Sequence, residues 1–395
     1  MRTLYLLDNY PEVLYTFLNG VYSTMNITET DPTKPFNELP FVPPIVDLKD
    51  QDLLLATLDA SDAIAQLKTM LTMSKRTIHN TLDLLSPLFV PEAVSSSGIE
   101  NIITTNDSVY VANIIQDREL SPAEKEAINY TQALFTASRK IFSKGYLTTN
   151  DYIALQKIIE PDKAGLRRLP GTQLANPITK KIYYTPPVGE SRIRGLLANF
   201  EKYFNDDSPK HEIFARMAIL HYQFEAIHPF SDGNGRTGRM LMPLYLTKQG
   251  RLPLPILFIS SYILEHRDEY YEKLRNVTYK GEWKEWILFI TDAAKNQALY
   301  TCGILEKIRD AINKVKKILK EKVPGVYSSE LVDFLFSNAY FTQKMFEDGI
   351  GVSRITARKY LQALEDNKVV KRSKQTGRNR YIYITPDYIN ILKHV

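Results

Sequence analysis

The spacing of apolar positions predicts helices over most of the first 300 residues. Between residues 51 and 90, apolar side chains recur at steps of three and four, as on one face of an α-helix. These positions are Leu53, Leu54, Leu58, Ile64, Leu67 and Met70. The segment SPAEKEAINYTQALF begins at Ser121 and has Glu124 three positions later, which predicts a helix that opens with a capping box. We expect further helices at 148–159, 192–204 and 211–227, followed by a buried helix containing MLMPLYL.

Two segments break this helical pattern. Residues 1–50 are proline-rich near PFNELPFVPP and have no long periodic run, so we expect an extended arm that packs on the rest. The segment GTQLANPITKKIYYTPP has turn residues at Asn176-Pro177 and then a short β-prone run, which predicts a β-hairpin or flap.

The last 70 residues have a different order of elements. A basic helical connector at 305–322 ends at Pro324-Gly325. Two short helices, a glycine-containing turn, a third helix capped by Ser353 and a strand pair at 369–384 are then expected, which is the order of a winged helix-turn-helix. The fold class is therefore mainly α. We expect four parts: an N-terminal arm with helices (1–115), a helical core with the hairpin flap (116–300), a basic helical linker (301–325) and the winged domain (326–395).

Composition narrows the class of protein. The chain has 395 residues, of which 44% are hydrophobic, enough for two or three domain cores. It has no apolar run near the roughly 18 residues of a membrane span. Its first residues do not resemble a signal peptide, and Cys302 is its single cysteine, so we expect a cytoplasmic protein without an internal disulfide.

The net charge of +5 is unevenly distributed. Residues 303–395 contain 18 Lys/Arg and 10 Asp/Glu, a balance of +8, which leaves −3 for residues 1–302. This asymmetry indicates an acidic partner for the C-terminal quarter.

Candidate catalytic and ligand-binding residues are concentrated in HPFSDGNGRTGR, from His228 to Arg239. Its glycines match G-x-G-x-x-G, but a helix is expected before them where a dinucleotide fold needs a strand. No lysine has the spacing of a phosphate-binding P-loop, and the histidines lack the spacing of a zinc protease.

A loop between two helices is the remaining interpretation. Gly233, Asn234 and Gly235 would free backbone N–H groups at the start of a helix, where the helix dipole favours anions. Arg236 and Arg239 lie at i and i+3, so both can point toward the same end of that helix. Asp232 fits such a site if it holds Mg²⁺ on a polyphosphate, and His228 is the group able to take a proton near neutral pH. The residues thus predict transfer chemistry on a magnesium-bound nucleotide.

This segment resembles the signature of Fic-domain proteins, H-x-F-x-D/E-G-N-G-R-x-x-R, at every specified position, and the resemblance extends over about residues 36–300. It implies transfer of AMP from ATP to a hydroxyl of a target protein. His228 would be the base and Asp232 the Mg²⁺ ligand. Gly233, Asn234 and Gly235 would surround the α- and β-phosphates with support from Arg236, while Arg239 would bind the γ-phosphate.

The same resemblance implies roles for three further segments. The hairpin would align the target, which makes Thr172, Ile182 and Tyr183 flap residues. HRDEYYEKL resembles the segment that lines the nucleoside pocket, with Tyr270 and Tyr271 as candidates. SSGIEN resembles the inhibitory motif S/T-x-x-x-E-G/N of self-restrained Fic proteins, here Ser96, Glu100 and Asn101. Glu100 would pair with Arg239, displace the γ-phosphate and, as in some members of the family, assist removal of AMP from the target.

The winged domain has two interpretations, phosphate contact with DNA or docking of a protein target. Its basic positions are Arg354, Arg358, Arg372, Lys374 and Arg378. A nucleotide-sensing DNA-binding transcription regulator is the alternative to an autoinhibited transferase, but a sensor has no use for His228. The sequence leaves a homodimer open and predicts no membrane partner.

Overall fold

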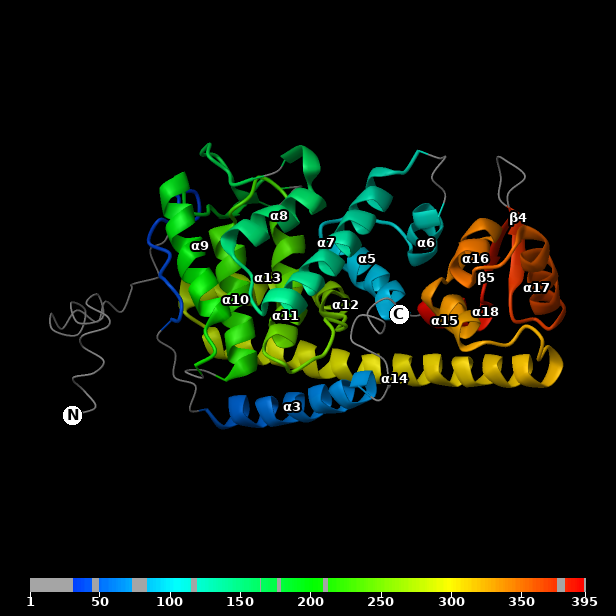
Figure 1. The fold of residues 1–395 in the computed structure, drawn as a ribbon. Coiled ribbons are helices and arrows are strands. Elements are labelled where there is room, and N and C mark those ends of the chain that lie inside the picture. The colour runs from blue at the N-terminus through cyan, green and yellow to red at the C-terminus, as the bar shows by residue number, and fades with distance from the viewer. Residues whose placement is uncertain are drawn as a thin grey trace.

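The computed structural model describes residues 31–44, 50–72, 84–114, 119–163, 165–175, 179–208, 212–374 and 381–393; for residues 373 and 374 only the backbone is described. Most of the expected N-terminal arm and Arg378 therefore lie outside the described residues. The structure is mainly helical, as predicted (Figure 1).

The helices of the first part pack as one body around the loop that contains His228. They are α5 (Phe89–Ile99), preceded by the 3₁₀ turn η2 (Ser86–Leu88), α6 (Asn106–Ile114), α7 (Pro122–Lys144), α8 (Thr149–Ile159), α9 (Glu190–Asn205), α10 (Ile213–Ile227), α11 (Asn234–Lys248), α12 (Ile259–Glu265) and α13 (Arg267–Lys280). A second 3₁₀ turn, η3 (Pro161–Lys163), follows α8, and β1 (Leu174–Ala175) and β2 (Ile182–Tyr184) form an antiparallel pair.

Local sequence signals explain where these helices begin. Ser121 accepts a hydrogen bond from the Glu124 amide, and the Glu124 carboxylate accepts one from the Ser121 amide, so the predicted capping box is present. Thr148 and Asp151 form a second capping box at the start of α8.

Aromatic side chains fill the centre of this body. Tyr152 of α8 packs edge-on against Phe200 and Phe204 of α9 and Phe224 of α10, and all four are buried. Such a core holds α10 rigidly, and α10 leads directly into the loop at His228.

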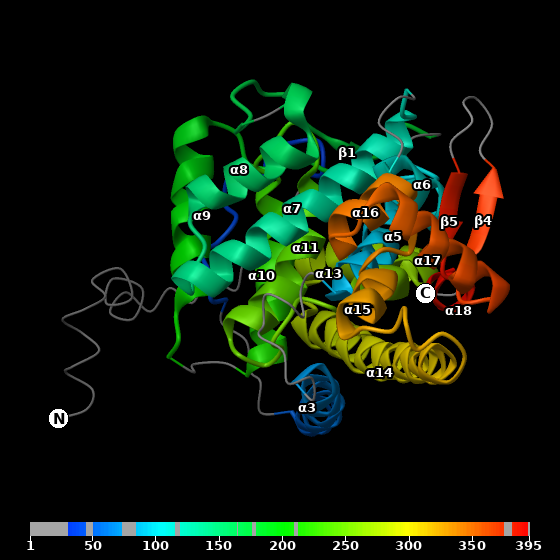
Figure 2. The same cartoon turned by 45° about the vertical axis from the view of Figure 1, so that its right-hand side comes forward.

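One long helix supports both parts of the molecule. α14 (Trp283–Lys322) has 40 residues, and α3 (Gln51–Thr72) lies along its first half (Figures 1 and 2). The boundary expected between residues 300 and 301 falls inside α14. The basic run at 305–322 therefore continues a core helix rather than forming a separate linker.

The C-terminal domain has the winged helix-turn-helix order. It contains α15 (Ser329–Ser337), β3 (Tyr340–Thr342), α16 (Gln343–Ile350), α17 (Arg354–Asp366), β4 (Lys371–Lys374), β5 (Tyr381–Ile384) and α18 (Pro386–Leu392). The strands form an antiparallel sheet in the order β3-β5-β4. Ser353 caps α17 as predicted, whereas β3 and α18 were not expected.

None of the helices in the described ranges combines the length and the apolar character needed to cross a membrane.

Candidate active site

The site lies in the turn that joins α10 to α11. His228 ends α10 in the left-handed conformation with φ of 48°, and Gly233 precedes α11 with φ of 78°. Between them Phe230 is fully buried, and the Asn234 side chain accepts from the Phe230 amide and donates to its carbonyl, both at 2.8 Å. Asn234 therefore fixes the shape of the loop with its side chain, so the first backbone amides of α11, which have no partner within the helix, stay available to an anion.

Arg239 is buried and held by the segment that contains the predicted inhibitory residues. Its Nε donates to Ser96 Oγ at 3.0 Å, and its Nη2 donates to the Ser96 carbonyl at 2.9 Å. The same Nη2 lies 2.8 Å from Glu100 Oε1. Glu100 follows the last residue of α5, so this one helix end supplies three acceptors to the guanidinium.

The pair with Arg239 sets the charge of Glu100. Burial acts to raise the pKa of the Glu100 carboxyl, but the charge and hydrogen bond of Arg239 outweigh it and hold that pKa below its usual range. Glu100 also lies against Gly235, where a Cβ atom would come within 2.3 Å of Oε1. A larger residue at position 235 would therefore displace this carboxylate from its place.

Arg236 has a separate set of carboxylates. Its Nη1 lies 2.5 Å from Glu126, and its Nη2 lies 2.6 Å from Glu160 and 3.3 Å from Asp232. The two arginines of the motif therefore do not converge on one end of α11, because Arg236 turns toward α7 and α8 while Arg239 turns toward α5.

Asp232 stands at the open edge of the loop. Its side chain is 38% exposed, and Oδ2 lies 2.5 Å from Lys163 Nζ, which is itself 57% exposed. Its Oδ1 accepts from the Gly233 amide at 2.7 Å. Burial acts to raise the Asp232 pKa, but the hydrogen bond from Lys163 and that from the Gly233 amide bring it below its usual range.

His228 is half-buried, and Arg167 orients its backbone. Arg167 Nε donates to the His228 carbonyl at 2.6 Å, and Nδ1 of His228 is buried without a hydrogen-bond partner among the described residues. Burial and then the positive charge of Arg167 lower the His228 pKa to about 4. The imidazole is therefore neutral at pH 7, as a proton acceptor must be.

Comparisons with known proteins agree with this geometry. Residues 146–246 match the Fic/DOC family, residues 54–139 match the Fic/DOC family N-terminal model and residues 311–388 match the C-terminal domain of SoFic-like protein adenylyltransferases. A Fido domain-containing protein of Dictyostelium discoideum is 38% identical over 104 residues, which cover 25% of this chain and 71% of that protein. The chain belongs to the Fic/DOC family.

Two further proteins differ in how much of their length this chain covers. The protein adenylyltransferase Fic of Aedes aegypti is 31% identical over 201 residues, which cover 49% of this chain but only 38% of that relative's length. The crystal structure of a Fic domain containing signaling protein from Bacteroides thetaiotaomicron has a TM-score of 0.51 at 14% identity. The match covers 63% of this chain and 96% of that one, and it shows the shared fold.

The hairpin of this Fic protein is tied to the end of α10. Leu174 faces Tyr184 and Ala175 faces Ile182, with Thr172 half-buried ahead of β1. The Tyr184 hydroxyl donates to the Ala226 carbonyl at 2.8 Å, two residues before His228.

A second tyrosine holds the hairpin from α13. The Tyr279 hydroxyl donates to the Tyr183 carbonyl at 2.5 Å. The hairpin therefore lies beside the loop, as a flap requires.

The two candidate nucleoside tyrosines have different surroundings. Tyr270 is only 1% exposed, packs against Trp286 and forms a 3.0 Å hydrogen bond with His221, so it is a core residue. Tyr271 is half-buried, and Arg267 lies 5.9 Å from its ring centroid. Of the two, Tyr271 remains a candidate for contact with a base.

Two buried acids near Arg239 were missed by the sequence analysis. Glu92 accepts hydrogen bonds from the amide and hydroxyl of Ser260. Glu225 has one carboxylate oxygen, Oε1, without a hydrogen-bond partner in the part of the chain that the structure describes. Burial raises the pKa of each to about 7. Glu225 stands three residues before His228, but the sequence carries no signal that its carboxyl is buried.

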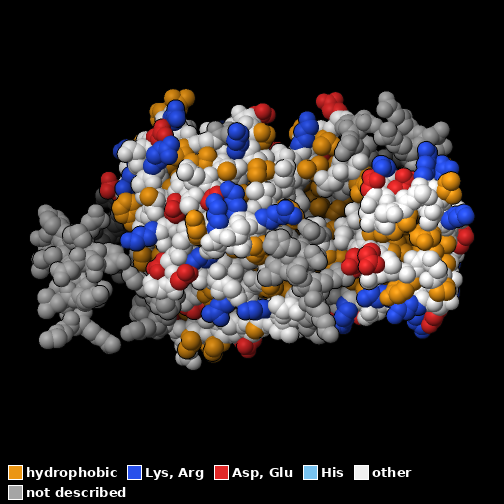
Figure 3. All heavy atoms as spheres, viewed as in Figure 1, with side chains coloured by type: hydrophobic (Ala, Val, Ile, Leu, Met, Phe, Trp, Pro, Cys, Tyr) orange, Lys and Arg blue, Asp and Glu red, His pale blue; other side chains and the backbone are white. Residues whose placement is uncertain are grey.

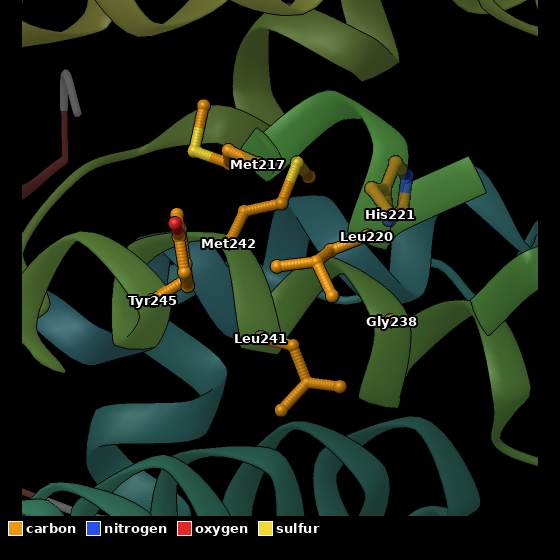
Figure 4. Close-up of a pocket in the computed structure, with 7 residues that line it drawn as sticks. All are labelled: Met217, Leu220, His221, Gly238, Leu241, Met242 and Tyr245. Carbon is orange, nitrogen blue, oxygen red and sulfur yellow. The ribbon is translucent and has the colours of Figure 1, made fainter. Parts of the chain in front are cut away.

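A small apolar pocket lies behind the loop. Met217, Leu220, Leu241 and Met242 from α10 and α11 line it with Tyr245, and His221 and Gly238 lie at one side (Figure 4). It is a packing defect of the core and contains none of the predicted phosphate-binding residues.

In the C-terminal domain, Arg354 and Arg358 of α17 are exposed, while Ala357, Leu361 and Leu364 face inward as predicted. Arg372 is exposed on β4, where its guanidinium lies 4.8 Å from the Tyr381 ring centroid. Lys374 lies on β4, and its side chain is not described. Lys and Arg side chains occur at several points around this domain on the face seen in Figure 3.

Proposed function

We propose that this Fic protein transfers AMP from ATP to a hydroxyl group of a target protein. The observation that carries the proposal is the loop between α10 and α11. This loop brings together the neutral imidazole of His228, the ionised Asp232 and the glycine-lined start of α11. Arg239 lies about one helical turn further along α11. Support also comes from the Aedes aegypti relative, whose name is that of a protein adenylyltransferase.

The reaction follows from the chemistry of these groups. His228 accepts the proton of the target hydroxyl, whose oxygen attacks the α-phosphorus of ATP. The bond from the α-phosphorus to the bridging oxygen breaks, and pyrophosphate leaves with that oxygen. The backbone at Gly233, Asn234 and Gly235 stabilises the charge that collects on the phosphate oxygens.

Mg²⁺ fits this site through Asp232. No three His, Cys, Asp or Glu side chains gather into a metal site among the described residues, so the remaining ligands must be phosphate oxygens and water. Asp232 is ionised and partly exposed, and the exposed Lys163 can give way to a cation. Bound Mg²⁺ supplies charge neutralisation for the phosphates.

We further propose that Glu100 restrains the reaction. Its carboxylate occupies the guanidinium face of Arg239 that would bind the γ-phosphate, so ATP must displace it or bind in an unproductive pose. In the same place Glu100 can orient a water that removes AMP from a modified target.

We also propose that Arg354, Arg358 and Arg372 of the C-terminal domain contact phosphates of DNA. The excess of positive charge after residue 302 and the exposure of these arginines support this second activity.

Labelling with ATP that carries its label on the α-phosphate tests the main proposal. Wild type, Glu100→Gly, Arg239→Ala and the double variant are each incubated with lysate and Mg-ATP. Glu100→Gly should label target proteins about ten- to a hundredfold faster, because a charge-assisted hydrogen bond contributes roughly 1.5–3 kcal/mol. Arg239→Ala and the double variant should both be slow, because each loses the ATP contact.

His228→Ala in the Glu100→Gly chain is the matched control. It should bind ATP but lose labelling by about 10²–10⁴-fold, and mass spectrometry should find AMP on the targets of the parent only. Equal labelling by the chains with and without His228 would refute the mechanism.

A further inference from the structure

The short helix α6 connects the C-terminal domain to the inhibitory segment. Only residues 101–105 separate Glu100 from the first residue of α6. In Figures 1 and 2, α6 lies between the α5–α7 side of the core and the C-terminal domain.

The C-terminal domain holds the first turn of α6 through polar contacts. The Tyr340 hydroxyl of β3 donates to Asp107 Oδ1 at 2.7 Å, and Lys393 Nζ lies 2.7 Å from Asp107 Oδ2. Asn106 Nδ2 donates to the Leu392 carbonyl at 3.2 Å. Two consecutive residues of α6 thus bind β3 and the end of α18.

α6 is also fixed to the turn that precedes α5. Tyr110 stacks on Tyr340 with ring centroids 6.0 Å apart, and its hydroxyl donates to the Pro87 carbonyl at 2.8 Å, in the turn that precedes α5. The Ile102 amide donates to the Ser97 carbonyl at 3.0 Å, which fixes the connection between the two helices. Tyr110 therefore contacts the C-terminal domain with its ring and the turn before α5 with its hydroxyl.

We infer that the C-terminal domain regulates transfer by holding α6 and thereby keeping the Glu100 segment on Arg239. This inference rests on the proposed function. Glu100 and Ser96 both bind Arg239 from the end of α5, so movement of that turn away from α11 releases the guanidinium. With α6 anchored, the docked domain favours the state in which Glu100 is paired. A ligand that binds the undocked domain better shifts the population toward the released state.

The test breaks the contact with α6 without touching Arg239 or Glu100. Asp107→Ala removes the acceptor of Tyr340 and Lys393, and Tyr340→Phe removes one hydroxyl while keeping the stacked ring. Each is compared, in the full chain, with Asp348→Asn, which removes the charge from the exposed 2.7 Å pair between Asp348 and Lys344 within α16. That control changes a pair inside the same domain that does not attach the domain to α6 or to α14.

Tyr340→Phe loses one ordinary polar contact and should raise target labelling by about threefold to tenfold, and Asp107→Ala, which loses two, should raise it at least as much. Asp348→Asn should not. In the Glu100→Gly chain, Asp107→Ala should leave the rate unchanged, because no inhibitory pair remains to release. Amide hydrogen exchange at residues 97–102 should also quicken in Asp107→Ala, a readout that does not depend on transfer.

The inference is overturned if Glu100→Gly labels fast while both α6 variants label and exchange like wild type. It is also overturned if Asp107→Ala raises the rate equally with and without Glu100. If Glu100→Gly transfers no AMP at all, the proposed function itself fails, and the exchange result alone reports on the coupling.

Discussion

At the scale of single residues, three carboxyl groups surround the buried guanidinium of Arg239, and they are in different electrical states. Glu100 is ionised and paired, whereas burial raises the pKa of Glu92 and Glu225 to about 7. A buried site tolerates one balanced pair far better than an excess of charge. The protein therefore holds one full negative charge beside Arg239, while the two other carboxyls are only partly ionised at neutral pH.

This arrangement predicts how stability changes with pH at Glu92. Its folded-state pKa of about 7 lies above the 4.5 of an unperturbed glutamate, so the acid favours folding below pH 4.5 and loses that effect as pH rises through 7. The shift is on the order of 3 kcal/mol. Glu92→Gln cannot ionise, so between pH 5 and pH 8 it should lose less free energy of unfolding than wild type by about that amount.

Urea unfolding at the two pH values measures the difference. Glu119→Gln, at an exposed acid, is the control and should follow wild type. If the free energy of unfolding of Glu92→Gln falls between pH 5 and pH 8 by as much as that of wild type, the Glu92 carboxyl does not have a raised pKa in the folded protein.

At the scale of elements, two tyrosine hydroxyl groups hold the hairpin in place, one on its own strand β2 and one on helix α13. Tyr184 binds the last turn of α10 and Tyr279 of α13 binds the Tyr183 carbonyl. Residues 31–44 add a third support, since the Phe36 amide donates to the Thr185 carbonyl at 2.9 Å. These contacts place the hairpin relative to His228, so they bear on where a target hydroxyl stands.

Removing one hydroxyl from this support should impair use of the target more than binding of ATP. Tyr184→Phe and Tyr279→Phe should each lower kcat/KM for the target by about fivefold, equivalent to one hydrogen bond of about 1 kcal/mol, with KM for ATP unchanged. Tyr222→Phe is the matched control, because its hydroxyl lies on α10 but pairs with Thr278 at 3.0 Å. An equal loss in all three variants would mean general destabilisation rather than flap alignment.

The sequence predicts interactions between residues that are close in the chain, but not most contacts between distant segments. The capping box at Ser121 and the loop from His228 to Arg239 were predictable, because their interacting groups lie within a few residues of one another. The pairing of Arg236 with Glu126 and Glu160 was not, since these partners come from α7 and the end of α8. β3 was missed because its three residues become a strand only by pairing with β5. Glu100 is the exception, found through a recognisable motif despite being 139 residues from Arg239.

At the scale of the whole molecule, α14 carries a catalytic body at one end and a basic domain at the other. Its 40 residues pack on α3 and α10 and then on α15 and α18 (Figure 1). Because one uninterrupted helix spans both parts, the C-terminal domain has a defined position relative to α6 and to the Fic loop. In the docked state, a ligand of that domain would therefore lie on a defined side of the Fic loop.

The charge balance of +8 after residue 302 leads to the last prediction, that the full chain binds duplex DNA through phosphate contacts. Counterion release makes such binding fall steeply with salt, by about 0.9 units of log K per unit of log salt for each phosphate neutralised. Arg354→Ala and Arg358→Ala should each lower the affinity for DNA. Each should also reduce the slope of log K against log salt by about 0.9, the value for one phosphate contact. Arg251→Ala, at an exposed arginine of the catalytic body, should change neither. Fluorescence anisotropy over a salt series measures affinity and slope together. If the chain is not retained on DNA even at low salt, the exposed arginines of α17 are better explained as a docking face for the protein target.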